Sequence, residues 1–223
     1  RSKNAMLFYE INRDLAYEVA IKAKAEGVAQ FIYISSMSIY GKNSGMITRN
    51  TVPRPRSHYG KSKYEAEKLL ESLADNHFLV AILRPPMVYG KGCKGNYRFL
   101  SRLAGHLPVF PDFPNSRSAI YIDNLCMYIQ EIIHNCRAGT YHPQNLEYIC
   151  TSEIVFMIAK LRGRKIVPFR MLNNLIRLIK IGSIEKAFGS LTYDFDITNY
   201  ENVSRHDFIG LDESLYAIEN DNN

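Results

Sequence analysis

Residues 29–41, AQFIYISSMSIYG, decide the fold class of this chain. They begin as an almost unbroken apolar and β-branched run and end in the hydroxyl groups of Ser35 and Ser36. A short apolar run of this kind is typical of a parallel strand that is covered on both faces. The sequence therefore predicts a buried strand that carries hydroxyl groups at its carboxyl end.

The segments on either side of this strand have helical periodicity. Residues 5–26 carry apolar side chains at helical spacing, and Gly27 stands where a helix would end. A loop rich in Gly, Pro, Asn and Ser follows at 41–57, then a helix from His58 to about Asn76 and a second buried strand at 78–83. This alternation is typical of βαβ units, so we predict an α/β fold with a parallel sheet.

Beyond residue 95 the pattern changes to helices and short strands in mixed order. The sequence predicts helices near 96–105, 123–135, 151–162 and 171–181, with a proline-punctuated segment before the second of them. We interpret this part as a smaller region that is attached to the sheet.

Composition and charge limit the classes of protein to which the chain can belong. It has 223 residues, 46% of them apolar, and no run approaches the roughly 18 apolar residues of a membrane-spanning helix. The N-terminal residues do not resemble a signal peptide. The cysteines form no CxxC pair and no zinc-binding spacing, so we predict reduced thiols, no metal site and a cytoplasmic protein. They are Cys93, Cys126, Cys136 and Cys150.

A formal net charge of +6 favours anionic ligands, and much of it comes from one segment. Residues 160–180 carry seven Lys or Arg and no acid. The plainer interpretation is the solvated face of an amphipathic helix. The alternative is a surface that docks on a membrane or on a partner.

The YGKSK motif at residues 59–63 opens the helix that follows the first strand. Positions i and i+4 lie on one face of a helix, so Tyr59 and Lys63 project together. A lysine ammonium lowers the pKa of a nearby phenol, which is about 10 when unperturbed, and this would make Tyr59 a general base. Ser36, at the strand end, can both donate and accept a proton. A single tyrosine with a lysine four residues later also arises by chance in a chain with 15 tyrosines. The position of this tyrosine and lysine, after a strand and a loop, is what favours a functional role.

The order of these motifs resembles that of the extended short-chain dehydrogenase/reductase family, in particular its NAD-dependent nucleotide-sugar epimerases and dehydratases of the UDP-glucose 4-epimerase type. The shared features are SSMSIYG at a strand end, YGKSK starting 23 residues after Ser36, and a strand ending in RPPMVYG at 84–90. The resemblance is clear from Asn12 to about Asp123 and looser beyond.

The resemblance implies roles for individual residues. Ser36, Tyr59 and Lys63 would be catalytic, with Tyr59 as the base and Lys63 also bonding the nicotinamide ribose. The NAD site would be lined by Asn12, Ser36, Tyr59, Lys63 and Pro86. The substrate site would comprise Asn96 and Arg117 for the diphosphate and the backbone of Val109 and Phe110 for the base. The alternatives remain that Asn96 only caps its helix and that Arg117 only pairs with a surface acid. Asp123 would cap the helix that it opens.

One expected motif is absent, because the family begins with a glycine-rich GxxGxxG turn and this chain has none. We therefore expect an incomplete Rossmann-type, doubly wound sheet whose N-terminal βαβ units, roughly 90 residues, are missing. Residues 1–95 would be the remaining part of the NAD-binding domain. Residues 96–223 would be mainly the mixed α/β substrate-binding region, with some segments returning to the sheet. Such a piece is expected to bind NAD poorly and to be inactive alone.

The residues beside Ser36 favour one reaction over others. Dehydratases of the family carry an Asp-Glu pair where this chain has Met37 and Ser38, so no acid is available for elimination of water. The resemblance then implies a UDP-sugar 4-epimerase that passes through a keto sugar, with a nucleotide-sugar reductase or dehydratase, or a truncated non-catalytic relative, as the alternatives. It implies a nucleotide-sugar substrate, polysaccharide precursor synthesis and a homodimer through the Tyr59 helix, and no nucleic-acid partner.

Overall fold

The computed structural model describes residues 2–93, 96–171, 173, 188–198 and 207–220. In chain order its elements are α1 (Ser2–Tyr9), the π-helical turn η1 (Glu10–Leu15), α2 (Ala16–Ala25), β1 (Gln30–Ile34), the 3-10 turn η2 (Met37–Tyr40), β2 (Gly45–Ile47), α3 (His58–Glu71), β3 (Leu79–Leu83), β4 (Met87–Tyr89), α4 (Asn96–His106), β5 (Val109–Phe110), β6 (Ala119–Tyr121), α5 (Ile122–His134), β7 (Gly139–Tyr141), α6 (Thr151–Leu161), β8 (Val167–Pro168), β9 (Leu191–Tyr193), the 3-10 turn η3 (Phe195–Ile197) and α9 (Leu211–Asn220).

The central sheet is parallel and has the strand order β1-β3-β7. Ile34 at the end of β1 lies opposite Leu83 at the end of β3, and Leu83 lies opposite Tyr141 of β7. The carboxyl ends of the three strands therefore meet at one edge. Three further parallel pairs, β2 with β9, β4 with β6 and β5 with β8, extend the molecule away from this sheet.

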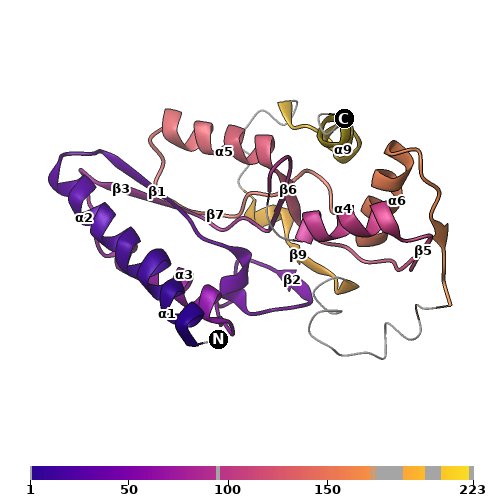
Figure 1. Ribbon diagram of the computed structural model, residues 1–223. Coiled ribbons are helices and arrows are strands. Elements are labelled where there is room, and N and C mark those ends of the chain that lie inside the picture. Colours follow the sequence, from indigo (N-terminus) through magenta and orange to yellow (C-terminus); the bar gives the residue numbers. More distant parts are fainter. Residues whose placement is uncertain (1, 94–95, 172, 174–187, 199–206, 221–223) are drawn as a thin grey trace.

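Helices cover both faces of the central sheet, with α1 to α3 on one face and α5 on the other (Figure 1). The alternation of side chains along β3 explains this arrangement. Val80 and Ile82 pack with residues of α2 and α3, while Ala81 and Leu83 pack with residues of α5. Because both faces of each strand are buried, the sequence of the strand is a nearly continuous run of apolar residues. The predicted α/β fold with a doubly wound parallel sheet is confirmed.

A second core lies at the other end of the molecule, where α4, α6 and α9 pack together (Figure 1). Apolar residues of α6 recur at helical spacing, and Ile154, Val155, Ile158 and Ala159 are all buried. They pack against β4 and β6, which connect this core to the central sheet. No helix in the described part of the chain is long and apolar enough to cross a membrane.

Most predicted elements lie within a few residues of the observed ones, and two details differ. The predicted helix at 5–26 contains the π-helical turn η1 in its middle. The prediction that Asp123 caps the following helix is wrong, because Tyr121 is the N-cap residue of α5 and Asp123 lies exposed in its first turn. The predicted helix near 171–181 lies almost entirely outside the described residues.

Candidate functional site

Ser36 lies where the chain leaves β1. The ladder continues one residue past β1, because Ser35 N–H donates to Leu83 O at 2.7 Å. Ser36 is then extended and caps η2, and its Oγ accepts a hydrogen bond from Ser38 N at 3.1 Å. The turn ends at Gly41, which has a φ of +63° and leaves no room for a Cβ beside Arg54 O. The strand end therefore holds Ser36 at the carboxyl edge of the sheet.

The first turn of α3 packs directly on η2. Ser57 caps α3 by accepting a hydrogen bond from Gly60 N at 3.0 Å. A Cβ on Gly60 would lie 2.7 Å from Ser38 O, so only glycine permits this approach of helix to turn. The contact brings Tyr59, the neighbour of Gly60, to the Ser36 side chain.

The Ser36 hydroxyl lies close enough to the Tyr59 phenol to affect its pKa. Burial raises the pKa of Tyr59, and the smaller effect of the Ser36 hydroxyl lowers it. The ring of Phe8 in α1 stands edge-on to the Tyr59 ring, with centroids 5.7 Å apart. The prediction that Lys63 lowers the pKa of Tyr59 is therefore wrong for this structure. Desolvation dominates, and Tyr59 is a neutral phenol at pH 7.

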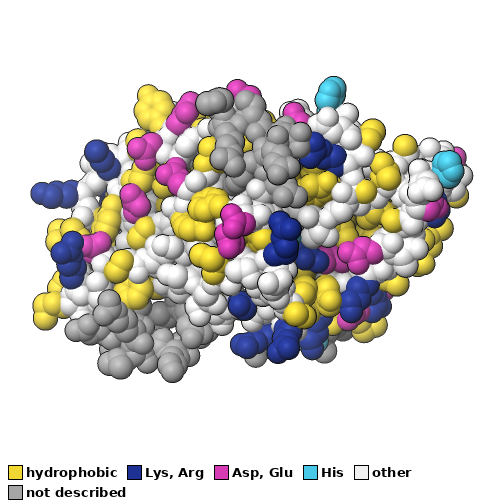
Figure 2. Space-filling view, turned by 180° about the vertical axis from the view of Figure 1, so that it is seen from behind, with side chains coloured by type: hydrophobic (Ala, Val, Ile, Leu, Met, Phe, Trp, Pro, Cys, Tyr) yellow, Lys and Arg dark blue, Asp and Glu magenta, His cyan; other side chains and the backbone are white. Residues whose placement is uncertain are grey.

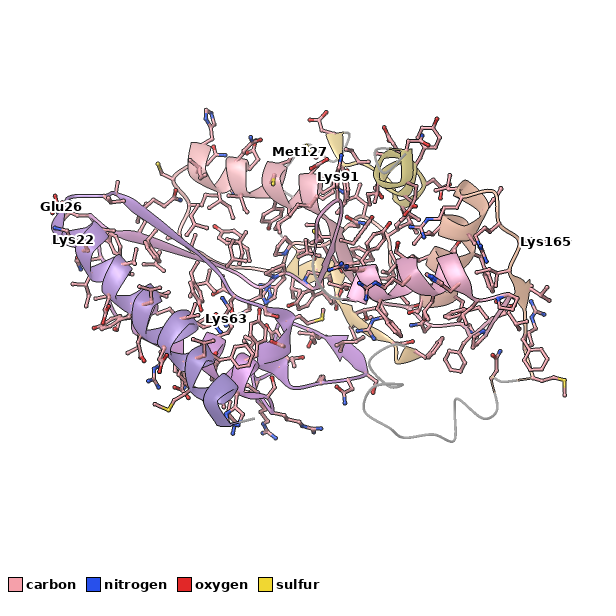
Figure 3. The ribbon with its side chains drawn as sticks, viewed as in Figure 1. Lys22, Glu26, Lys63, Lys91, Met127 and Lys165 are labelled. Carbon is pink, nitrogen blue, oxygen red and sulfur yellow. The ribbon has the colours of Figure 1, made fainter. Side chains whose placement is uncertain are left out.

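Lys63 lies on the same helix as Tyr59 but its ammonium is held by the strand. Nζ donates to Ile34 O at 2.9 Å and stands 4.6 Å from the centroid of the Tyr33 ring. Burial lowers the pKa of Lys63, opposed by the charge of Glu67. Figure 3 labels Lys63 in the middle of the molecule, beside α3. The cation thus lies at the strand end, one helical turn from the phenol.

Asn12 lies in η1, against α3. Its Nδ2 donates to Ser62 Oγ at 3.1 Å, and its carbonyl accepts a hydrogen bond from Tyr33 OH at 2.7 Å. Tyr33 is thus bonded to Asn12 on its hydroxyl and covered by Lys63 on its ring. π-helical turns are rare and often occur at functional sites. The turn here places Asn12 beside the helix that carries Tyr59 and Lys63.

Pro86 follows β3 at the same edge of the sheet as Ser36. Met37 N donates to Pro85 O at 2.9 Å, which ties the turn after β1 to the segment after β3. The five residues predicted for catalysis and cofactor binding therefore lie around the carboxyl ends of two adjacent strands and the helix between them. In open α/β sheets this is the edge where ligands bind.

The residues predicted for substrate binding lie in the other half of the molecule. Asn96 is the first residue of α4, and its side chain lies outside the described part. Val109 is exposed, whereas the side chain of Phe110 is buried in the core of α4, α6 and α9. Any contact of Phe110 with a ligand would therefore be made by its backbone.

Arg117 lies between β9 and the segment before α6. Its backbone bonds to that of Ile149 in both directions at 2.9 Å, and its Nη1 donates to Gly189 O at 2.7 Å. Burial lowers the pKa of its guanidinium, and no ion pair joins it to an acid in the described residues. A half-buried cation without a counter-charge is costly, so this position suits an anionic ligand.

The sequence analysis missed a buried network of charged and polar side chains between α3 and the end of β3. Glu67 is 1% exposed, and its carboxylate receives Nε and Nη2 of Arg84 at 3.2 and 2.7 Å. Arg84 Nη1 donates to Tyr40 OH at 2.9 Å, and Tyr40 OH lies 2.8 Å from His142 Nε2. Tyr40 OH therefore links the Arg84 guanidinium to His142. A sequence signal exists, since Glu67 falls between the buried Ala66 and Leu70 of the apolar stripe.

We expect His142 to make stability fall in mildly acidic solution. Burial and the charge of Arg84 lower the pKa of His142 to about 4, while an unfolded histidine has a pKa of about 6.5. Between these values only the unfolded chain binds the proton, so the free energy of unfolding decreases as pH falls through the window, by up to about 3 kcal/mol. Urea unfolding of His142→Gln between pH 7.5 and 4.5 should show a weaker decrease.

The exposed His77 provides the control for this prediction. His77→Gln should keep the pH dependence of the unchanged protein. Identical slopes for His142→Gln and the unchanged protein would contradict the assignment.

Comparisons with known proteins identify the family of this chain. The model of the NAD dependent epimerase/dehydratase family matches residues 1–145. UDP-glucose 4-epimerase of Vibrio cholerae is 36% identical over 140 residues, which are 60% of this chain and 43% of that protein. N-acetyl-alpha-D-glucosaminyl-diphospho-ditrans,octacis-undecaprenol 4-epimerase of Escherichia coli O157:H7 is 30% identical over 138 residues, 60% of this chain and 42% of that protein. The chain therefore spans less than half the length of these two relatives.

Solved structures share the fold. UDP-glucuronic acid 4-epimerase from Bacillus cereus, in complex with NAD, has a TM-score of 0.73 at 21% identity, with 94% of this chain and 66% of that chain covered. dTDP-4-dehydrorhamnose reductase from Bacillus anthracis, in complex with NADP, has a TM-score of 0.73 at 22% identity, with 99% and 75% covered. The strand-end serine, the YGKSK helix and the matched family model lead to one conclusion: this chain belongs to the NAD dependent epimerase/dehydratase family.

Proposed function

We propose that the protein is an NAD-dependent epimerase of a nucleotide-diphosphate sugar, with a UDP-sugar 4-epimerase as the first choice. The observation that carries this proposal is the proximity of the Tyr59 phenol to the Ser36 hydroxyl at the carboxyl end of β1, on the helix that also carries Lys63. Family membership supports the reaction class. The absence of an acid at Met37 and Ser38 favours epimerisation over elimination of water.

Tyr59 would exchange a proton with the hydroxyl of the sugar carbon that is oxidised and later reduced. Ser36, close to Tyr59, would hold that hydroxyl and pass its proton. Because burial keeps Tyr59 protonated, its ionisation needs a nearby positive charge, and Lys63 lies on the same helix face. NAD, when bound, supplies the hydride acceptor and donor. The protein orients the sugar and moves the proton.

The residues present fit the nicotinamide end of this cofactor. The hydroxyl oxygens of Ser35 and Ser38, on either side of Ser36, are buried and have no hydrogen-bond partner in the described part of the chain. Buried polar atoms are normally bonded, so this strand end suits a polar ligand. Asn12, Ser36, Lys63 and Pro86 would contact the nicotinamide and its ribose. No GxxGxxG turn for the pyrophosphate occurs among the 223 residues.

The substrate would lie between residues 1–95 and 96–223, which we propose as the cofactor and substrate regions. Arg117 would bind a diphosphate oxygen, since it is half-buried with no acid joined to it in the described residues. Asn96 at the start of α4 would offer backbone N–H groups to the same diphosphate. The backbone of Val109 and Phe110 would hold the base.

A sugar diphosphate that is carried by a lipid is the second candidate substrate. The relative from Escherichia coli is named for such a substrate. The exposure of Val109 and of its strand partner Val167 favours an apolar group at this end of the site. Both candidate substrates contain the sugar and the diphosphate. They differ in the group on the other side of the diphosphate, which is a nucleoside in the first and a lipid in the second.

The test is interconversion of sugars by the gene product at its full natural length. It is incubated with NAD and a panel of UDP-, GDP- and dTDP-linked sugars and one polyprenyl-diphosphate sugar, and the products are followed by NMR. Appearance of the 4-epimer of a nucleotide sugar is the expected result. Turnover of the lipid-linked sugar alone would select the second candidate. Net reduction of a 4-keto sugar by added NAD(P)H, without epimerisation, would overturn the proposal in favour of a reductase.

A further inference from the structure

The β5–β8 pair turns one face outward at the end of the molecule distant from α2. Val109 lies opposite Val167 in the parallel register, and their neighbours Phe110 and Ile166 are buried. The ladder continues one residue further, because Phe169 N donates to Phe110 O at 2.9 Å. Since side chains alternate along a strand, this outer face is apolar. Its exposed side chains are Val109 (40%), Val167 (52%) and Phe169 (38%), and the exposed Met171 (79%) follows in the turn after β8.

Basic side chains accompany these apolar ones along the chain. Residues 160–171 contain five Lys or Arg and no acid. Arg162 is bonded to Glu219, and Arg170 is bonded to Asp112. The other three are exposed, and no ion pair joins them to an acid within the described residues: Lys160, Arg164 and Lys165. We call these three cations, together with the four apolar side chains, the apolar–basic surface.

The figures place this surface at one extremity of the molecule. Figure 3 labels Lys165 at the end opposite Lys22 and Glu26. From behind, dark-blue, yellow and magenta side chains lie beside one another at the left end, which carries β5 and β8 (Figure 2). A flat contact at this extremity would therefore be reached without obstruction by α1 to α3.

We propose that the apolar–basic surface docks on a bilayer that contains anionic phospholipid. Apolar side chains that enter the headgroup region, ringed by Lys and Arg that meet lipid phosphates, are the combination that binds membrane interfaces. Charge complementarity favours this occupant over a second copy of the chain, which carries the same positive surface. The surface is also small, because a stable protein interface takes roughly 20–30 residues a side.

Docking would bring the proposed substrate segment to the bilayer. Val109 belongs both to the apolar–basic surface and to the segment that we propose for substrate contact. A sugar diphosphate carried on a polyprenyl chain is presented at that level of the membrane. The docking itself needs neither substrate nor cofactor, so it is tested separately from the reaction.

The experiment is co-sedimentation of the full-length gene product with vesicles of phosphatidylcholine alone or with 30% phosphatidylglycerol. Binding is expected only to the anionic vesicles, and it should weaken strongly in 1 M salt, where charges are screened within about 3 Å. Arg164→Gln/Lys165→Gln should lower the partition coefficient roughly 30-fold, since each cation contributes about 1 kcal/mol near an anionic surface. Val167→Ser/Met171→Ser should lower it about tenfold through lost apolar burial.

Matched controls carry the same changes elsewhere. Lys22→Gln/Lys61→Gln removes two exposed charges from α2 and α3, and Met6→Ser/Val19→Ser removes two exposed apolar side chains from α1 and α2. Both should bind as the unchanged protein does, and thermal unfolding by circular dichroism should show that all variants fold. No binding to anionic vesicles, or equal binding by the surface variants and their controls, overturns the proposal. A change of oligomeric state with the surface variants, measured by light scattering, overturns it in favour of self-association.

Discussion

Replacing Tyr59 by Phe is expected to lower kcat about 10³-fold, in the middle of the range for loss of a general acid–base group. The change removes one oxygen and keeps the ring that packs edge-on against Phe8. Because Lys63 is held by Ile34 O and not by Tyr59, the cofactor contacts should survive and NAD affinity should stay within about threefold. The measurement is the rate of epimerisation by NMR together with NAD titration by calorimetry.

The pH dependence separates a proton-transfer role from a structural one. The unchanged enzyme should gain activity as pH rises, because Tyr59 must lose its proton and burial raises its pKa. The residual activity of Tyr59→Phe should lack this rise. Tyr216→Phe is the matched control, since Tyr216 is 60% exposed in α9. Turnover by Tyr59→Phe within a few-fold of the unchanged enzyme would reject Tyr59 as the base.

Glu67→Gln is expected to lower the free energy of unfolding by about 3 to 5 kcal/mol, the usual effect of removing one partner of a buried ion pair. Glu67 is 1% exposed and accepts two hydrogen bonds from Arg84, whose side chain is 13% exposed. A neutral amide would leave the guanidinium with no full counter-charge in the network described above. Urea unfolding at pH 7.5 measures the loss.

Two further variants make this prediction specific. Glu67→Leu/Arg84→Met removes both charges, so it should be more stable than Glu67→Gln. A buried charge that has lost its partner costs more free energy than two apolar side chains in the place of the ion pair. Glu18→Gln in α2 changes an exposed acid and should shift the free energy of unfolding by less than about 0.5 kcal/mol. A decrease of less than about 1 kcal/mol in the free energy of unfolding of Glu67→Gln would contradict the stabilising role of this buried ion pair.

Local patterns predicted the central strands and the helix between them with useful accuracy. The apolar run at 29–35 becomes β1, and the helix predicted to start at His58 does start there. The spacing of Tyr59 and Lys63 also placed both residues on the same helix, α3. These features depend on residues that are near one another in the sequence, so short-range chemistry determines them.

Features that depend on distant segments were not predictable in the same way. The pKa of Tyr59 is set by burial, partly beneath Phe8, about fifty residues earlier, and the i, i+4 spacing contains no information on desolvation. The pair of Arg84 and Glu67 joins a strand end to a helix. The pairing of β5 with β8 brings together segments separated by two helices and two strands, and it alone turns Val167 outward. Tertiary packing decided each of these outcomes.

The contact between Gly60 and η2 has a consequence for how the chain can vary. The Ser38 oxygen that faces Gly60 belongs to the backbone, so it cannot swing aside as the end of a flexible side chain could. Any larger residue would move the start of α3 away from η2 and so increase the distance between the Tyr59 phenol and the Ser36 hydroxyl. The absence of a Cβ at Gly60 therefore sets how closely the Tyr59 phenol can approach Ser36.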